Sequence, residues 1–155
     1  MKRLPIGIIA AALALAPAGA NAESFTFKSK THVIDDVSVN SGQTVITDAI
    51  SKSDITITYE NGEKEQNATT CANWTVPPGP RFTSDGICTF VTQSGGKGTI
   101  VFSCHDDAKT NTSDCWGSLR GTAGRFKGKS GTISWHQILG ADGMTGNDAG
   151  TGMWN

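Results

Sequence analysis

Clustered positive charge is missing from this sequence. The chain holds 13 lysine and arginine residues against 14 aspartate and glutamate residues. The densest basic segment contains Arg120, Arg125, Lys127 and Lys129, and glycines are interspersed among these residues. Nucleic acids and anionic membranes attract proteins mainly through concentrated positive charge. We therefore expect no nucleic-acid partner. We interpret the four basic residues as the solvated face of strands and turns, with a polyanion site as the alternative.

Apolar segments long enough to cross a bilayer are also missing. The main apolar stretch, residues 4–15, is shorter than the roughly 20 residues that a spanning helix requires. Lys2 and Arg3 precede it and the small residues 20–22 follow it, which is the order of a secretory signal peptide. We expect residues 1–22 to be removed after Ala22, with no membrane insertion after cleavage. An uncleaved membrane anchor is the alternative.

The mature segment has the size of one small domain. Removing 22 of the 155 residues leaves 133, which is enough for one modest core and too few for two comfortable domains. Without Lys2 and Arg3 the segment keeps 11 basic against 14 acidic residues, a formal charge of −3. We expect a single domain over residues 23–155 that is periplasmic or secreted by a bacterium. Nothing in the sequence indicates an oligomeric state.

Cysteine is absent before Cys71, and the chain has four cysteines in total. An even number in an exported protein favours disulfides over free thiols. Of the three connectivities we favour Cys71–Cys88 with Cys104–Cys115, because each bridge joins neighbours in a chain whose sequential strands usually pair. A metal site is the alternative, but the cysteines do not have the close spacing of zinc knuckles. We therefore expect no metal and no cofactor.

Helical periodicity does not appear in the mature segment. Apolar and polar residues instead alternate at period two, which is typical of half-buried strands. The clearest runs are Phe25 to Lys28, Ile55 to Tyr59, Ile100 to Cys104 and Thr132 to His136. Asn61-Gly62 indicates a tight hairpin turn. Many short strands without helical crossovers predict an all-β domain, either an antiparallel barrel or a β-sandwich, and we favour the barrel.

Two segments fall outside this pattern. We expect Cys71 to Arg81 to be an irregular loop, since several prolines lie near its end. Leu139 to Asn155 contains five glycines. This second segment predicts a loose tail, or a loop that leads into a short last strand at Met153-Trp154.

No catalytic motif stands out. The Gly-x-Ser-x-Gly elbow of serine hydrolases does not occur. His32 and His136 stand alone, and we interpret them as surface or satisfied histidines. His105-Asp106-Asp107 invites a metal or acid–base interpretation, but a charged run between two strands is more typical of a solvated hairpin loop.

Aromatic residues recur on one face of several predicted strands. If that face points into a barrel, these side chains are candidates for binding an apolar ligand; the alternative is that they form the core. The candidates are Tyr59, Phe90, Phe102 and Trp135.

The segment from Gly121 to Gly131 has glycines at intervals of three, four and three around a single aromatic, Phe126. Glycines allow positive φ and bulges, so the spacing predicts a structural corner between two strands. We expect Phe126 to pack inward or to cover a glycine-rich strand, and its neighbours Arg125 and Lys127 to face water. A phosphate-binding loop is the alternative, but such loops precede a helix, whereas a strand pattern follows here.

This same segment carries a resemblance. Cys115-Trp116-Gly117, followed by Gly121-Thr-Ala-Gly124-Arg-Phe126-Lys-Gly128 and Gly131-Thr132, resembles the glycine signature of the allene oxide cyclase and dirigent group. The resemblance covers about a quarter of the mature segment. It implies an eight-stranded antiparallel barrel with an interior cavity that shapes hydrophobic substrates or radicals. The signature is structural, so it assigns a fold and no catalytic residue.

Three function classes are compatible with these observations. We expect a barrel that binds a small apolar molecule in its interior without catalysis, because aromatics line one face while no catalytic set is visible. One alternative is an isomerase or cyclase that acts on a hydrophobic substrate in the same interior. The other is a protein with a filled barrel whose outer surface contacts macromolecules. An eight-stranded barrel has room for side chains alone or for one small ligand.

Overall fold

The computed structural model describes residues 22–41, 44–76 and 82–155. The expected signal peptide lies outside these residues except for Ala22, and so do the prolines of the expected loop before Arg81. Within the described residues no helix is long and apolar enough to cross a membrane.

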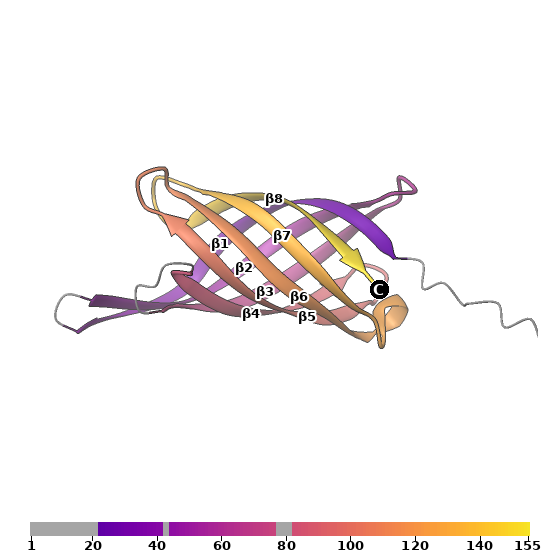
Figure 1. The fold of residues 1–155 in the computed structure, drawn as a ribbon, viewed down its shortest axis with the longest axis horizontal. Helices are drawn as coiled ribbons and strands as arrows, with labels where there is room; N and C mark the ends of the chain where they lie inside the picture. The colour runs from indigo at the N-terminus through magenta and orange to yellow at the C-terminus, as the bar shows by residue number, and fades with distance from the viewer. Residues whose placement is uncertain (1–21, 42–43, 77–81) are drawn as a thin grey trace, which may run out of the picture.

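The chain forms a closed antiparallel barrel of eight strands, which confirms the expected fold class (Figure 1). Each strand pairs with the next along the sequence, and β8 returns to pair with β1. The closure excludes the sandwich alternative. A short 3₁₀ helix, η1, connects β6 to β7. The elements are β1 (Glu23–Ser41), β2 (Thr44–Tyr59), β3 (Lys64–Thr75), β4 (Ser84–Thr92), β5 (Lys97–Asp107), β6 (Thr112–Ala123), η1 (Gly124–Phe126), β7 (Ser130–Leu139) and β8 (Thr145–Trp154).

The two ends of the barrel differ. One end carries the C-terminus, the start of β1 and the corner between β6 and β7. The other end carries the β5–β6 and β7–β8 turns, and the paired ends of β1 and β2 extend past the barrel wall there as a long hairpin (Figure 1). We call the first the closed end and the second the open end, for the reasons that follow.

The prediction of an irregular loop from Cys71 to Arg81 is wrong over its first part. β3 continues to Thr75 and stays paired with both β2 and β4. Its inward positions near the open end are Cys71, Asn73 and Thr75, which line a cavity instead of an apolar core. The strand therefore has no apolar alternation by which the sequence could reveal it.

The prediction of a loose tail, or of a loop that leads into a short last strand at Met153-Trp154, misses most of a longer strand. β8 runs over ten residues and closes the barrel between β7 and β1. Its inward positions include Gly150 and Gly152, which face Phe27 and Phe25 on β1. A Cβ at either glycine would overlap the facing ring. Glycine is therefore required here by close packing, and a glycine-rich strand does not look like a strand in sequence.

The closed end is packed around Phe126, which is 1 % exposed. Its ring stacks on that of Trp154 with centroids 4.8 Å apart and meets Phe90 edge-on at 5.9 Å. η1 places Phe126 over the interior, and Gly124 and Gly128 on either side have positive φ. The expected corner, with Phe126 packed inward, is confirmed.

Arg125 is exposed, as expected, and its side chain also contacts other residues at the surface. Its guanidinium lies 4.4 Å from the centroid of the Tyr59 ring and forms ion pairs with Glu23 and Glu63. Lys127 is exposed, as expected.

The favoured disulfide pairing is confirmed. Cys71 bonds to Cys88 and Cys104 to Cys115, each between residues that face one another on adjacent strands. All four cysteines are therefore oxidised. Two disulfides are consistent with an oxidising compartment outside the cytoplasm.

Replacing both Cys104 and Cys115 with serine should lower the free energy of unfolding. The bridge closes a loop with a sequence separation of 11. The loss should be roughly 3 kcal/mol, because the chain-entropy model assigns about that value to loops of this size. Urea unfolding of the double variant beside the parent measures it. Equal stability of the two proteins would show that this bridge does not constrain the unfolded chain.

Candidate functional site

The open half of the barrel contains a cavity of about 320 Å³. Side chains from all eight strands line it, together with residues of the β7–β8 turn such as Met144. Beneath it, toward the closed end, the interior is filled and leaves a void of only about 30 Å³. The barrel is thus a container that is plugged at one end.

The floor of the cavity is apolar. Phe27, Ile55, Ile100 and Ile133 line both the cavity and the small void below it, so they separate the two. Phe102 and Trp135 stand on the wall, with ring centroids 5.2 Å apart in an edge-to-face arrangement. These aromatic and aliphatic groups offer an apolar body a place to pack.

The rest of the wall is rich in hydroxyl and amide groups. Most of these residues are small, which is why the cavity stays open at this level while the closed end is filled by aromatic rings. They are Ser29, Thr31, Thr47, Ser51, Ser53, Thr69, Asn73, Thr75, Ser84, Ser113, Thr145 and Gln137.

Among the described residues, Asp106 is one of two carboxylates on the wall. β5 continues to Asp107, so the expected solvated loop at His105-Asp106-Asp107 is wrong for Asp106, which alternation turns inward while both neighbours are exposed. Its Oδ2 accepts hydrogen bonds from the hydroxyls of Thr83 (2.6 Å) and Ser84 (3.0 Å). The Ser113 hydroxyl donates to Oδ1 at 2.6 Å. Both carboxylate oxygens are therefore satisfied within the protein.

Asp148 on β8 is the second carboxylate, and its hydrogen bonding is incomplete. The hydroxyls of Ser29 and Thr31 donate to its Oδ2, the latter at 2.7 Å. Oδ1 has no hydrogen-bond partner among the described residues, although the side chain is only 8 % exposed. Sequence reasoning missed this residue because β8 was not recognised as a full strand. The signal was the period-two series Gly146, Asp148, Gly150 and Gly152.

The cavity wall is negatively charged. Of the lining residues that the structure describes, Asp106 and Asp148 are the two acidic ones, and none is lysine, arginine or histidine. Inside a low-dielectric barrel, unbalanced carboxylates act over a longer range than they do in water. The arrangement therefore favours a ligand with positive charge or hydrogen-bond donors over an anion.

The four aromatic residues that sequence analysis singled out separate into two pairs. Phe102 and Trp135 line the cavity. Phe90 packs in the closed half against Phe126 and Trp154. Tyr59, at the same end, is 3 % exposed and donates a hydrogen bond from its hydroxyl to Glu65 Oε2 at 2.8 Å.

The Tyr59–Glu65 contact is part of a buried hydrogen-bonded group at the closed end. Burial and the hydrogen bond to Glu65 raise the pKa of Tyr59 above its usual value, so the phenol stays protonated. Burial alone would raise the pKa of Glu65, but three hydroxyl donors and the nearby charge of Arg125 bring this pKa below its usual value. Both groups thus hydrogen-bond to other residues of the protein. The cavity in the open half is therefore the candidate ligand site inside the barrel.

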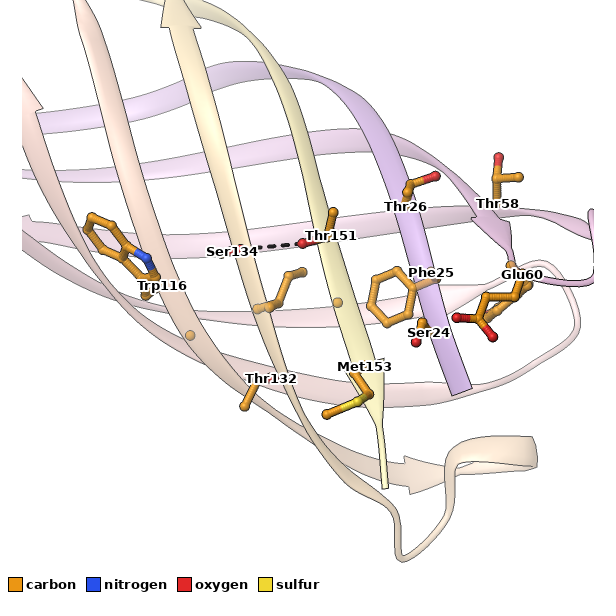
Figure 2. Close-up of a pocket in the computed structure, with 14 residues that line it drawn as sticks. Ser24, Phe25, Thr26, Thr58, Glu60, Trp116, Thr132, Ser134, Thr151 and Met153 are labelled. Atoms are coloured by element: carbon orange, nitrogen blue, oxygen red, sulfur yellow. Dashed lines mark hydrogen bonds between the residues drawn. The ribbon is translucent and has the colours of Figure 1, made fainter. Parts of the chain in front are cut away.

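A larger groove, of about 680 Å³, lies on the outer face of the barrel (Figure 2). Thr26, Thr151 and Ser134 lie side by side there on β1, β8 and β7, and the exposed Trp116 stands at its edge on β6. In the described part of its lining, Glu60 is the one titratable group apart from the buried Tyr59. This groove is less enclosed than the interior cavity and has fewer converging polar groups, so the interior is the better candidate site.

The described residues contain no group of three or more histidine, cysteine, aspartate or glutamate side chains that could hold a metal ion. No family model matches this chain, and no curated protein matches it in sequence. The resemblance to the allene oxide cyclase and dirigent group therefore stays a prediction from the glycine segment. The geometry of the cavity is the basis for the functional argument below.

Proposed function

We propose that this protein is an exported, non-catalytic binding protein that holds a small, largely apolar molecule in the open half of its barrel. The observation that carries the proposal is the division of the interior into a plugged half and a cavity of about 320 Å³ with Phe102 and Trp135 on its wall. Small-molecule sites begin at about this volume and combine apolar walls with a few converging polar groups.

Export is supported by two separate features. Residues 1–22 have the charge, apolar and small-residue order of a signal peptide. The two disulfides fit an oxidising compartment. The site of action is then the periplasm or the medium, where the barrel would meet molecules outside the cytoplasm.

Binding is favoured over an isomerase or cyclase activity by the state of the polar groups. The cysteines on the cavity wall are bridged. Asp106 is held by three hydroxyl donors, which is typical of a structural carboxylate. Acid–base catalysis needs a positioned group that can exchange a proton with the substrate. Among the described residues, Asp148 is the one wall carboxylate with an unpartnered oxygen, so it is the single wall carboxylate left for such an exchange.

Replacing Trp135 with alanine should weaken binding of N-phenyl-1-naphthylamine, a neutral aromatic probe whose fluorescence rises in apolar surroundings. The loss should be at least about tenfold in Kd, because the variant removes a large aromatic surface from the cavity wall. Fluorescence titration of the purified protein measures this change.

Trp116→Ala is the matched control, since it removes the same side chain from the outer groove, where Trp116 is 51 % exposed. It should leave Kd within about twofold of the parent. The reverse result, with binding lost in Trp116→Ala and kept in Trp135→Ala, would move the site to the outer face. No binding by the parent would refute the proposed function.

A further inference from the structure

The two carboxylates of the cavity wall are held in similar cradles but end in different states. Each accepts hydrogen bonds from serine and threonine hydroxyls that lie on neighbouring strands or, for Thr83, just before one. Three donors satisfy both oxygens of Asp106. Two donors satisfy only Oδ2 of Asp148. Oδ1 of Asp148 is thus the polar atom of the wall that the protein has buried without a partner, among the residues described.

A buried carboxylate oxygen without a donor is costly, and the cost is greater when the carboxylate has no counter-ion. No basic residue lines the cavity in the described part of the chain. One more hydroxyl beside Asp148 would satisfy Oδ1, as a third hydroxyl does for Asp106. The inward positions on both sides of Asp148 along β8 are instead glycines, Gly146 and Gly150.

An aromatic residue of the same cavity wall lies on the strand next to this carboxylate. Gln137 faces Asp148 across the β7–β8 pair and Trp135 faces Gly150, so Trp135 and Asp148 are diagonal neighbours on the wall. Diagonal positions lie within reach of a large side chain. A carboxylate next to an indole is a suitable pair for an ammonium group, which gains an ion pair from one and a cation–π contact from the other.

We propose that the ligand of the open half is a small apolar amine whose protonated nitrogen donates a hydrogen bond to Asp148 and whose apolar body packs on Phe102 and Trp135. This inference rests on the function proposed above and names the chemical class of its ligand. Oδ1 is covered by neighbouring atoms in this structure. The ligand reaches it when the carboxylate turns about its Cβ–Cγ bond, a torsion that is broad for aspartate.

The test compares 2-phenylethylamine with 2-phenylethanol, which has the same apolar body and no charge. Isothermal titration of the purified parent at pH 7 should give a Kd at least about tenfold lower for the amine, because hydrogen bonds to charged groups are the stronger class. Asp148→Asn should remove this preference and leave the affinity for the alcohol within about twofold. The variant should fold, since an amide oxygen can still accept from Ser29 and Thr31.

Asp54→Asn is the control for net charge, because Asp54 is exposed and β2 directs it outward. It should keep the amine preference. Equal binding of amine and alcohol by the parent would overturn the inference without any variant, and so would an amine preference that survives in Asp148→Asn. In either of these two cases, Trp135-dependent binding of the neutral probe N-phenyl-1-naphthylamine would keep the proposed function, and only the amine assignment would fall. If neither probe nor amine binds, both fall.

Discussion

Replacing Phe126 with alanine should lower the free energy of unfolding by about 3–5 kcal/mol, the usual range for a buried phenylalanine. Phe126 is 1 % exposed and plugs the closed end of the barrel between Phe90 and Trp154. Its removal leaves a cavity beside these two rings, and that cavity adds to the cost of the lost apolar surface. Urea unfolding monitored by circular dichroism measures the change.

Two neighbours of Phe126 serve as controls in the same experiment. Lys127→Ser should change stability by less than about 0.5 kcal/mol, because Lys127 is exposed. Arg125→Ser should cost more than Lys127→Ser, since Arg125 covers the Tyr59 ring and pairs with Glu23. Parental stability in Phe126→Ala would mean that the closed end is not a packed core, and the division of the interior would have to be abandoned.

The sequence predicted the fold where its inward positions are apolar. Alternation located Phe25 to Lys28 and Ile55 to Tyr59, whose inward residues pack in the closed half. It failed for the second part of β3 and for β8, where inward positions hold polar groups or glycine. Those positions face either the cavity or an aromatic ring from the next strand. Period-two hydrophobicity cannot report a strand whose buried face is a polar wall.

The site was predicted only in part, for a related reason. Phe102 and Trp135 were identified as interior aromatics, but the same pattern marks Tyr59 and Phe90, which help to plug the other end. Which aromatics face free space depends on how the barrel is filled along its axis, and this requires all eight strands in register.

The two carboxylates could not be assigned from sequence either. Asp106 resembles part of a charged turn, and Asp148 lies in a segment that resembles a tail. Each became a wall residue only when strand pairing fixed which way it points. The unpartnered Oδ1 of Asp148 depends in addition on hydroxyls from β1, which lies more than a hundred residues away in sequence.

Replacing Gly121 with valine should destabilise the barrel by about 4 kcal/mol or more, because the backbone leaves no space for a side chain there. A Cβ at this position would overlap the carbonyl group of Phe126, which belongs to the rigid corner. The corner is closed on Gly121 itself: its N–H donates to the Lys129 carbonyl at 2.9 Å, and its own carbonyl accepts from Gly128 N–H at 3.2 Å. Relief of the overlap therefore requires these hydrogen bonds to break.

Gly128→Ala separates lack of space from backbone conformation at the same corner. Gly128 has φ +81, but a Cβ there meets nothing within 4 Å. The variant should therefore lose only about 1–3 kcal/mol from the strained φ. The sequence pattern weighted the corner glycines alike, whereas the geometry ranks Gly121 above Gly128. Urea unfolding of both variants tests this ranking. A greater loss of stability in Gly128→Ala than in Gly121→Val would show that the positive φ at Gly128 matters more for this corner than the close approach of Phe126 to β6.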